Sequence, residues 1–217
     1  MHRLLLFFTL ILSISCADKN TLIYEKIDIL NINKILNDKD IVVLDVRTLE
    51  EINAGYIPNS TFIDYYDKNF ENKINLINAS KKIYTLCKSG GRSVKAAEIL
   101  SKNGFRNVYN LEGGFMRWKA NKMPYDINLV NNDSSNTDLI SEISLDSLIK
   151  NNTNTLIYIS TKWCSPCKKM EPIIDKLVDN NSSLKVIKVD LDANTYAQER
   201  FDVKSLPALV LYENNSV

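Results

Sequence analysis

Cys87 is the first candidate for sulfur chemistry, because it ends an apolar run and opens a short glycine-rich loop. The residues that follow it are Lys88, Ser89, Gly90, Gly91, Arg92 and Ser93. A strand that ends in cysteine and turns into a helix aims the thiol at the helix N-terminus, and paired glycines let backbone N–H groups point inward as an anion nest. With a nearby arginine, such a site favours a thiolate or a bound anion. A buried structural cysteine is the alternative.

Cys164 and Cys167 form a second candidate site, two thiols three residues apart at a predicted helix start. This spacing brings the sulfurs close enough to bond. The helix N-terminus favours a thiolate at Cys164, which attacks a disulfide, and Cys167 then attacks the mixed intermediate. A structural bridge is an alternative, but it would close almost no loop. A four-thiolate zinc site would have to recruit Cys16 and Cys87, which stand in incompatible settings.

Composition narrows the chemistry further. The only histidine among 217 residues is His2, so neither a Cys–His pair nor a zinc site with histidine can form once a leader is removed. We expect no metal and no cofactor. The net charge of +1 gives no field that favours nucleic acid. The expected partners are small sulfur donors, such as thiosulfate or persulfides, and client protein disulfides.

The first sixteen residues have the features of an export signal. Arg3 precedes an apolar run from Leu4 to Leu12, which is too short to cross a bilayer but suits a signal-peptide core. The segment ends in Ser15-Cys16 and resembles the bacterial lipoprotein signal, which usually has leucine where Ser13 stands. The resemblance implies lipidation of Cys16 and a periplasm-facing lipoprotein in the cell envelope, touching the membrane only through that lipid. Ordinary secretion is the alternative.

The elements predicted around these sites alternate between strand and helix. Residues 41–46 are predicted as a buried parallel strand, 82–86 and 108–109 as further strands, and 93–102 as a helix. Thr48 and Glu51 have the spacing of a capping box. After a polar stretch come helix 145–150, strand 155–160, a helix to 178, strand 184–189, helix 196–201 and strand 208–212. We therefore predict an α/β chain with mostly parallel sheets, divided into 1–16 (signal), 20–125, linker 126–141 and 142–217.

The first of these domains resembles a single-domain rhodanese. The matching segments are Asp45-Val46-Arg47, Ala54 to Ser60, Cys87 to Ser93, and Asn110 to Phe115 with Trp118. The resemblance implies a three-layer sulfurtransferase fold with Cys87 as persulfide carrier, Arg92 at the end of the loop, and Asp45 and Arg47 bracing the site. Related phosphatases have a loop one residue longer than the four residues that separate Cys87 from Arg92 here.

The second domain resembles thioredoxin, through Trp163 to Lys168, Pro172, and Ser205 to Ala208. This resemblance implies that Pro207 is a cis proline facing the dithiol. Tyr158 stands where the family often buries an aspartate that accepts the proton of the second cysteine, whereas Lys188 matches the family. The family continues with another strand and helix beyond the point that matches Val217, so we expect this domain to be C-terminally incomplete.

Two functional hypotheses follow. The first is an exported sulfurtransferase and thiol–disulfide oxidoreductase, in which Cys87 carries sulfane sulfur and Cys164 attacks that sulfur or a client disulfide, with Cys167 resolving. The second is a non-catalytic rhodanese-like binding module attached to an envelope thiol–disulfide reductase. The complete loop after Cys87 favours the first.

Overall fold

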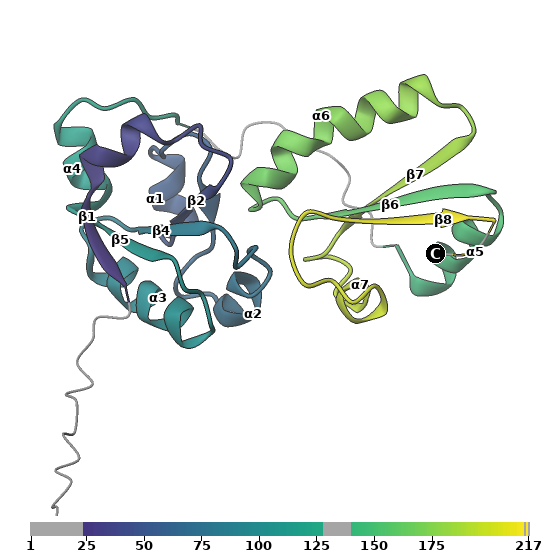
Figure 1. The fold of residues 1–217 in the computed structure, drawn as a ribbon, viewed down its shortest axis with the longest axis horizontal. Helices are drawn as coiled ribbons and strands as arrows, with labels where there is room; N and C mark the ends of the chain where they lie inside the picture. Colours follow the sequence, from purple (N-terminus) through teal and green to yellow (C-terminus); the bar gives the residue numbers. More distant parts are fainter. Residues whose placement is uncertain (1–23, 128–139, 215, 217) are drawn as a thin grey trace, which may run out of the picture.

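The computed structural model describes residues 24–127, 140–214 and 216, which form two α/β units (Figure 1). The predicted signal segment with Cys16, and residues 128–139 of the predicted linker, lie outside the described residues. In the described part of the chain, no helix has both the length and the apolar character needed to span a membrane.

The first unit is built on a five-stranded sheet in which every pairing is parallel, as predicted. The strand order is β1-β5-β4-β2-β3. The strands are β1 (Glu25–Asp28), β2 (Ile41–Asp45), β3 (Thr61–Phe62), β4 (Lys82–Leu86) and β5 (Val108–Glu112). The helices are the 3₁₀ helix η1 (Ile29–Lys34) and the α-helices α1 (Leu49–Asn53), α2 (Phe70–Ile74), α3 (Gly91–Lys102) and α4 (Gly114–Ala120).

Two apolar clusters, one on each face of this sheet, make it the middle of three layers. On one face, Ile74 of α2 and Leu100 of α3 pack against β2 and β4. On the other, Ile32 of η1 and Trp118 of α4 pack against the same strands. β2 is buried over most of its length, as expected for a strand covered on both sides. The predicted three-layer architecture is therefore confirmed.

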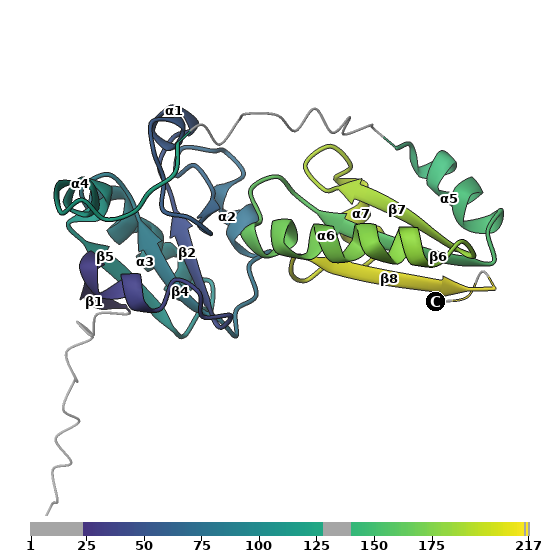
Figure 2. The same cartoon turned by 90° about the horizontal axis from the view of Figure 1, so that it is seen from above.

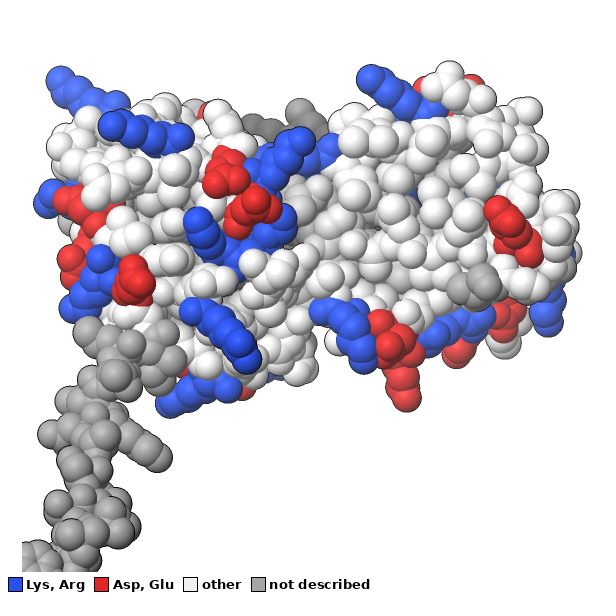
Figure 3. Space-filling model, viewed as in Figure 1, with Lys and Arg blue, Asp and Glu red and all other residues white. Residues whose placement is uncertain are grey.

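The second unit has a three-stranded sheet, with β6 between β7 and β8. Its elements are α5 (Glu142–Lys150), β6 (Asn154–Ser160), α6 (Ser165–Asn180), β7 (Leu184–Asp190), α7 (Tyr196–Arg200) and β8 (Ala208–Glu213). β6 runs parallel to β7 and antiparallel to β8. Leu209 and Leu211 of β8 are nearly half exposed, and the face over β8 and α6 carries few charged side chains (Figure 3).

The two units touch where the N-terminal end of α6 meets the first unit (Figure 2). The first unit contributes the edge strand β3 and the segment that follows α2. The N–H of Phe62 donates to the carbonyl of Trp163 (3.2 Å). Because Trp163 directly precedes Cys164, the contact between the units lies at the predicted dithiol site.

Some element bounds differ from the sequence prediction for identifiable reasons. β5 extends to Glu112 rather than ending at 109, because its later residues pair with β1, for example Lys26 with Asn110. α5 begins at Glu142, three residues earlier than predicted, because Ser141 caps it by accepting a hydrogen bond from the N–H of Ser144 (3.1 Å).

Candidate active sites

The loop that carries Cys87 begins where β4 ends and is held by the turn between β5 and α4. The N–H of Phe115 donates to the carbonyl of Cys87 (2.9 Å), and the N–H of Met116 donates to that of Lys88 (3.0 Å). Gly114, with φ of 59°, allows this approach, because a Cβ there would lie 2.6 Å from the Cys87 carbonyl oxygen and 2.5 Å from that of Lys88. The turn and the loop therefore fix each other.

The sulfur of Cys87 lies at the base of this loop, and the residue is only 1% exposed. The N–H of Gly90 donates to the sulfur at 3.0 Å. Gly90 has φ of 122°, a conformation that glycine adopts without strain. Burial raises the pKa of the thiol, but hydrogen bonds from the hydroxyl and N–H of Ser93 and from the N–H groups of Gly90 and Ser89 outweigh it, so the pKa of Cys87 is lowered overall. The predicted backbone cradle is present.

Arg92 is held at the end of the loop by Glu51, a partner that the sequence did not identify. Its two terminal nitrogens donate to the two carboxylate oxygens of Glu51, at 2.7 and 2.8 Å. The Arg92 hydrogen bond lowers the pKa of Glu51 to about 2, against the opposing effect of burial. Glu51 also completes the predicted capping box with Thr48. One carboxylate thus caps α1 and orients the cation of the loop.

Asp45 and Arg47 form a buried ion pair with 2.6 Å between Nη2 and Oδ2. Arg47 also donates to the carbonyls of Gly55 (2.9 Å) and Glu51 (3.3 Å), and its guanidinium lies 4.0 Å from the centre of the Phe115 ring. All of these contacts engage the Arg47 guanidinium with groups of the first domain itself. The pair braces the strand end and the helix that carries Glu51, as the resemblance implied, rather than presenting a cation to an anion.

The remaining residues of the predicted loop differ in their exposure to solvent. Lys88, Ser89 and Gly91 are exposed, whereas Ser93 is buried beneath the loop. Its hydroxyl lies 3.0 Å from the Gly90 carbonyl oxygen and also within reach of the Cys87 sulfur, and its one proton rotates to donate to either acceptor. The contribution of Glu51 was missed because it reaches Arg92 across 41 residues of sequence. Its position in the capping box was the only sequence signal that it has a fixed orientation.

The second site contains a disulfide between Cys164 and Cys167 at the N-terminus of α6. The sulfur of Cys164 accepts a hydrogen bond from the N–H of Cys167 (3.2 Å), so Cys164 is the N-cap residue of the helix, as expected. The peptide bond between Leu206 and Pro207 is cis, and Pro207 and Cys164 line the same crevice. The prediction of a cis proline beside the dithiol is confirmed.

Tyr158 of β6 and Lys188 of β7 both contact α6, the helix that begins at the disulfide. The hydroxyl of Tyr158 donates to the carbonyl of Cys167 (2.8 Å), and burial raises the pKa of this tyrosine to about 12. Tyr158 therefore anchors the first turn of α6 and does not replace a proton-accepting carboxylate at neutral pH. Lys188 bonds to Asp175 (2.7 Å) and Glu171 (3.3 Å) of α6.

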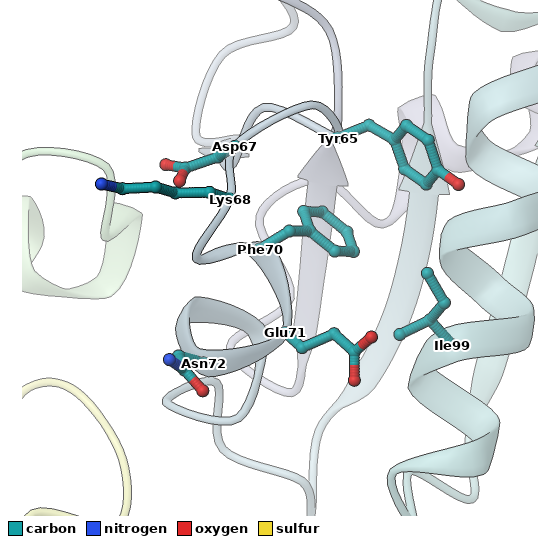
Figure 4. A pocket seen from close by; sticks show the side chains of 7 residues that line it. All are labelled: Tyr65, Asp67, Lys68, Phe70, Glu71, Asn72 and Ile99. Atoms are coloured by element: carbon teal, nitrogen blue, oxygen red, sulfur yellow. The ribbon is translucent and has the colours of Figure 1, made fainter.

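Two pockets are associated with the first unit. One, of about 220 Å³, lies between the units and is lined by residues of both, including Lys81, Trp163 and Cys164; Cys87 is not among its lining residues. The other, of about 330 Å³, lies between α2 and α3, where Tyr65 and Phe70 face Ile99 (Figure 4). The second pocket contains no thiol. Of these two pockets, only the one between the units is lined by a cysteine, Cys164.

Comparison with known proteins agrees with this division. Residues 31–121 match the rhodanese-like domain family and residues 136–217 the thioredoxin family. The chain is 34% identical over 91 residues to "Putative sulfurtransferase YtwF" of Bacillus subtilis, covering 42% of this chain and 85% of that protein. It is 39% identical over 90 residues to a tRNA uridine(34) hydroxylase of Pelagibacter ubique, covering 41% of this chain and 30% of that protein. It is 31% identical over 68 residues to thioredoxin of Rickettsia bellii, covering 31% of this chain and 65% of that protein.

The fold and the two family matches define a chain that joins a rhodanese-like domain to a thioredoxin domain. The chain belongs to the rhodanese-like family through its first domain and continues into a thioredoxin domain. It spans less than a third of the hydroxylase that it matches.

Proposed function

We propose that the first domain is a sulfurtransferase in which Cys87 carries a persulfide. The observation that carries this proposal is the set of N–H groups around the buried sulfur, with Gly90 N–H at 3.0 Å and a thiol pKa lowered by hydrogen bonds from Ser93, Gly90 and Ser89 despite burial. The same donors can solvate the charge of a persulfide. No imidazole is needed for this step.

In the proposed reaction, the Cys87 thiolate attacks the outer sulfur of thiosulfate. The sulfur–sulfur bond of thiosulfate breaks, sulfite leaves with the electron pair, and Cys87 retains the sulfur as a persulfide anion. An acceptor thiolate then attacks the outer sulfur, forms its own persulfide and releases the Cys87 thiolate. No proton has to be transferred in either step, which suits a site without a general base.

The proposed reaction of the thioredoxin domain is dithiol–disulfide exchange. The Cys164 thiolate attacks one sulfur of a client disulfide and releases one client thiolate. The thiolate of Cys167 then attacks the Cys164 sulfur, which restores the intramolecular disulfide and releases the second client thiolate. Cys164 can also attack the outer sulfur of the Cys87 persulfide, which releases the Cys87 thiolate and leaves a persulfide on Cys164. The Cys167 thiolate then attacks the Cys164 sulfur, forms the disulfide and releases sulfide. A separate reductant must regenerate the dithiol.

The two activities are separated by the Cys87→Ser variant. We expect it to lose sulfur transfer from thiosulfate to cyanide while retaining reduction of insulin disulfides by the dithiol-reduced protein. The matched Cys167→Ser variant should show the opposite pattern. Sulfur transfer that survives in Cys87→Ser would remove the proposed role of Cys87.

The competing proposal is that the first domain only binds a partner or an anion. The distinction is made by intact mass after treatment with thiosulfate, followed by peptide mapping. One additional sulfur on the peptide that contains Cys87 supports the enzyme. An unmodified Cys87 in folded protein supports the binding module.

We also propose export to the bacterial cell envelope with a lipid on Cys16, on the basis of the sequence from Arg3 to Cys16 alone. Mass analysis of the amino-terminal peptide from the membrane fraction tests this proposal. A mature chain that begins with an acylated Cys16 is the expected result, and a soluble chain cleaved near Ser15 would contradict lipidation.

A further inference from the structure

The surface around the Cys164 sulfur is covered by the rhodanese-like domain. Cys164 is only 3% exposed and Cys167 2%. Leu76, which follows α2 in the first domain, is 6% exposed and belongs to the apolar cluster of the thioredoxin domain that also contains both cysteines and Leu206. In the other direction, Trp163 packs against the cluster of the first domain on the α2–α3 side of its sheet. Each domain thus inserts one large apolar side chain into the other.

Backbone hydrogen bonds accompany these apolar contacts. The N–H of Leu206 donates to the carbonyl of Leu76 at 2.8 Å, and the N–H of Phe62 donates to the carbonyl of Trp163 at 3.2 Å. These two bonds use the main chain on either side of the disulfide, at Leu206 and at Trp163. Main-chain groups of this kind can pair with any extended segment, and a neighbouring pocket then selects its side chain.

We propose that the segment centred on Leu76 is an internal pseudo-substrate, which occupies the client-binding surface of the thioredoxin domain. A client disulfide has to reach the Cys164 sulfur across Trp163 and Leu206, and both residues are engaged by the first domain. Client binding and docking of the domains are therefore mutually exclusive. This inference rests on the proposed dithiol exchange and identifies its client class as an extended segment with a large apolar side chain.

The chemistry of the interface favours reversible docking. The indole nitrogen of Trp163, whose ring packs against apolar clusters of both domains, is buried and has no hydrogen-bond partner among the described residues. Leaving a buried donor unpaired is unfavourable, and opening the interface restores its contact with water. Among the residues that the structure describes, one ion pair crosses the interface, between Lys73 and Asp192 at 3.6 Å. Its side chains are partly exposed, and such pairs contribute little.

The Leu76→Asp variant tests the proposal through the reactivity of Cys164. Burying a carboxylate in an apolar cluster is strongly unfavourable, so the domains should separate. We expect Cys164 in the dithiol-reduced protein to react at least about tenfold faster with a maleimide that carries a long polyethylene glycol chain. The Ile143→Asp variant is the matched control, because Ile143 is 80% exposed on α5 and the same change there should leave the rate unaltered.

Peptide mapping assigns the label to Cys164, and thermal unfolding shows whether each variant is folded. The Asp192→Lys variant, which places two lysines opposite each other at the rim, provides a second route if Leu76→Asp does not fold; it should accelerate labelling by a few-fold. Equal rates in wild type, Leu76→Asp and Ile143→Asp would overturn the proposal, whether all are fast or all are slow. Faster labelling of Leu76→Asp with no reduction of insulin by any variant would leave the docking established and refute the proposed exchange activity.

Discussion

At the scale of single residues, Cys87 shows how a thiol can be kept reactive in the absence of histidine. Desolvation of a sulfur that is 1% exposed opposes ionisation. Hydrogen bonds from Ser93, Gly90 and Ser89 more than compensate for this. Arg92 adds positive charge, but Glu51 balances much of it through a two-point contact. The hydrogen bonds, rather than the arginine, are therefore what lowers the thiol pKa against the effect of burial.

The Ser93→Ala variant tests whether hydrogen bonds to the sulfur lower the pKa of Cys87. Loss of the hydroxyl removes one donor to the sulfur, so the pKa of Cys87 should rise and alkylation at neutral pH should slow by about tenfold, as for one hydrogen bond to a charged acceptor. The measurement is the pH dependence of Cys87 alkylation by iodoacetamide in protein with an intact Cys164–Cys167 disulfide. Ser101→Ala is the control, since Ser101 lies in the last turn of the same helix and donates to the Ala97 carbonyl (2.9 Å). An identical pH profile of alkylation for Ser93→Ala and Ser101→Ala would contradict the role of the Ser93 hydroxyl as a donor to the Cys87 sulfur.

Glu51 gives a pH-dependent contribution to stability. Its pKa is lowered from 4.5 to about 2 in the folded protein, chiefly by the hydrogen bond from Arg92. A lowered folded-state pKa stabilises the fold fully above the unfolded-state pKa, and the effect is lost as pH falls through the folded-state value. We expect Glu51→Gln to reduce the free energy of unfolding by on the order of 2–3 kcal/mol at pH 7, with a difference that shrinks as pH falls from about 4.5 towards 2.

Urea unfolding of the wild type and Glu51→Gln across this range measures the effect. Glu50→Gln is the matched control, because Glu50 is the exposed neighbour of Glu51 in α1, and it should have little effect at any pH. A difference between wild type and Glu51→Gln that stays constant down to pH 3 would indicate lost packing rather than a lost ion pair.

At the scale of elements, the turn between β5 and α4 positions the Cys87 loop. Two N–H groups of α4 bind the carbonyls of Cys87 and Lys88, and Gly114 provides the space for this contact. We predict that Gly114→Ala destabilises the first domain by roughly 2 kcal/mol or more and abolishes persulfide formation, because the new Cβ would meet two carbonyl oxygens.

The Gly104→Ala variant isolates the backbone contribution in this experiment. Gly104 also has a positive φ, 90°, but a Cβ there would have nothing within 4 Å, so a loss of about 1 kcal/mol from backbone strain alone is expected. Thermal unfolding and the mass gain after thiosulfate treatment report stability and function respectively. Equal effects of the two substitutions would refute the steric role of Gly114.

The elements that are marked by a local hydrophobic pattern or by capping residues were predicted well from the sequence. The strand before Cys87, the capping box at Thr48 and the helix after the second thiol pair follow from local pattern and capping chemistry. Contacts between distant segments were not predictable in this way. Glu51 reaches Arg92, the turn at Gly114 supports Cys87, and Leu76 joins the apolar cluster that contains Cys164. Each of these contacts depends on tertiary packing rather than on local sequence.

At the scale of the whole molecule, the two thiol centres belong to different parts of the architecture. The first domain presents the Cys87 loop where β4 ends, and it uses its β3 edge and the Leu76 segment to contact the thioredoxin domain. β2 lies between β3 and β4 in the sheet. In the docked arrangement both leading cysteines are almost fully buried, and Cys87 is not among the residues that line the pocket beside Cys164.

The forces that hold the domains together determine how salt should affect this arrangement. Net charge is only +1, acidic and basic side chains are interspersed over the first domain (Figure 3), and Leu76 and Trp163 provide apolar contacts across the interface. Apolar burial is not screened by ions, whereas the partly exposed ion pair between Lys73 and Asp192 is screened. Raising salt to about 1 M should therefore change the labelling rate of Cys164 in wild type by less than about twofold.

The same salt should slow labelling of Asp192→Lys towards the wild-type rate, because it screens the repulsion between the two lysines. Strong acceleration of wild-type labelling by salt would mean that charge, rather than Leu76, holds the pseudo-substrate in place.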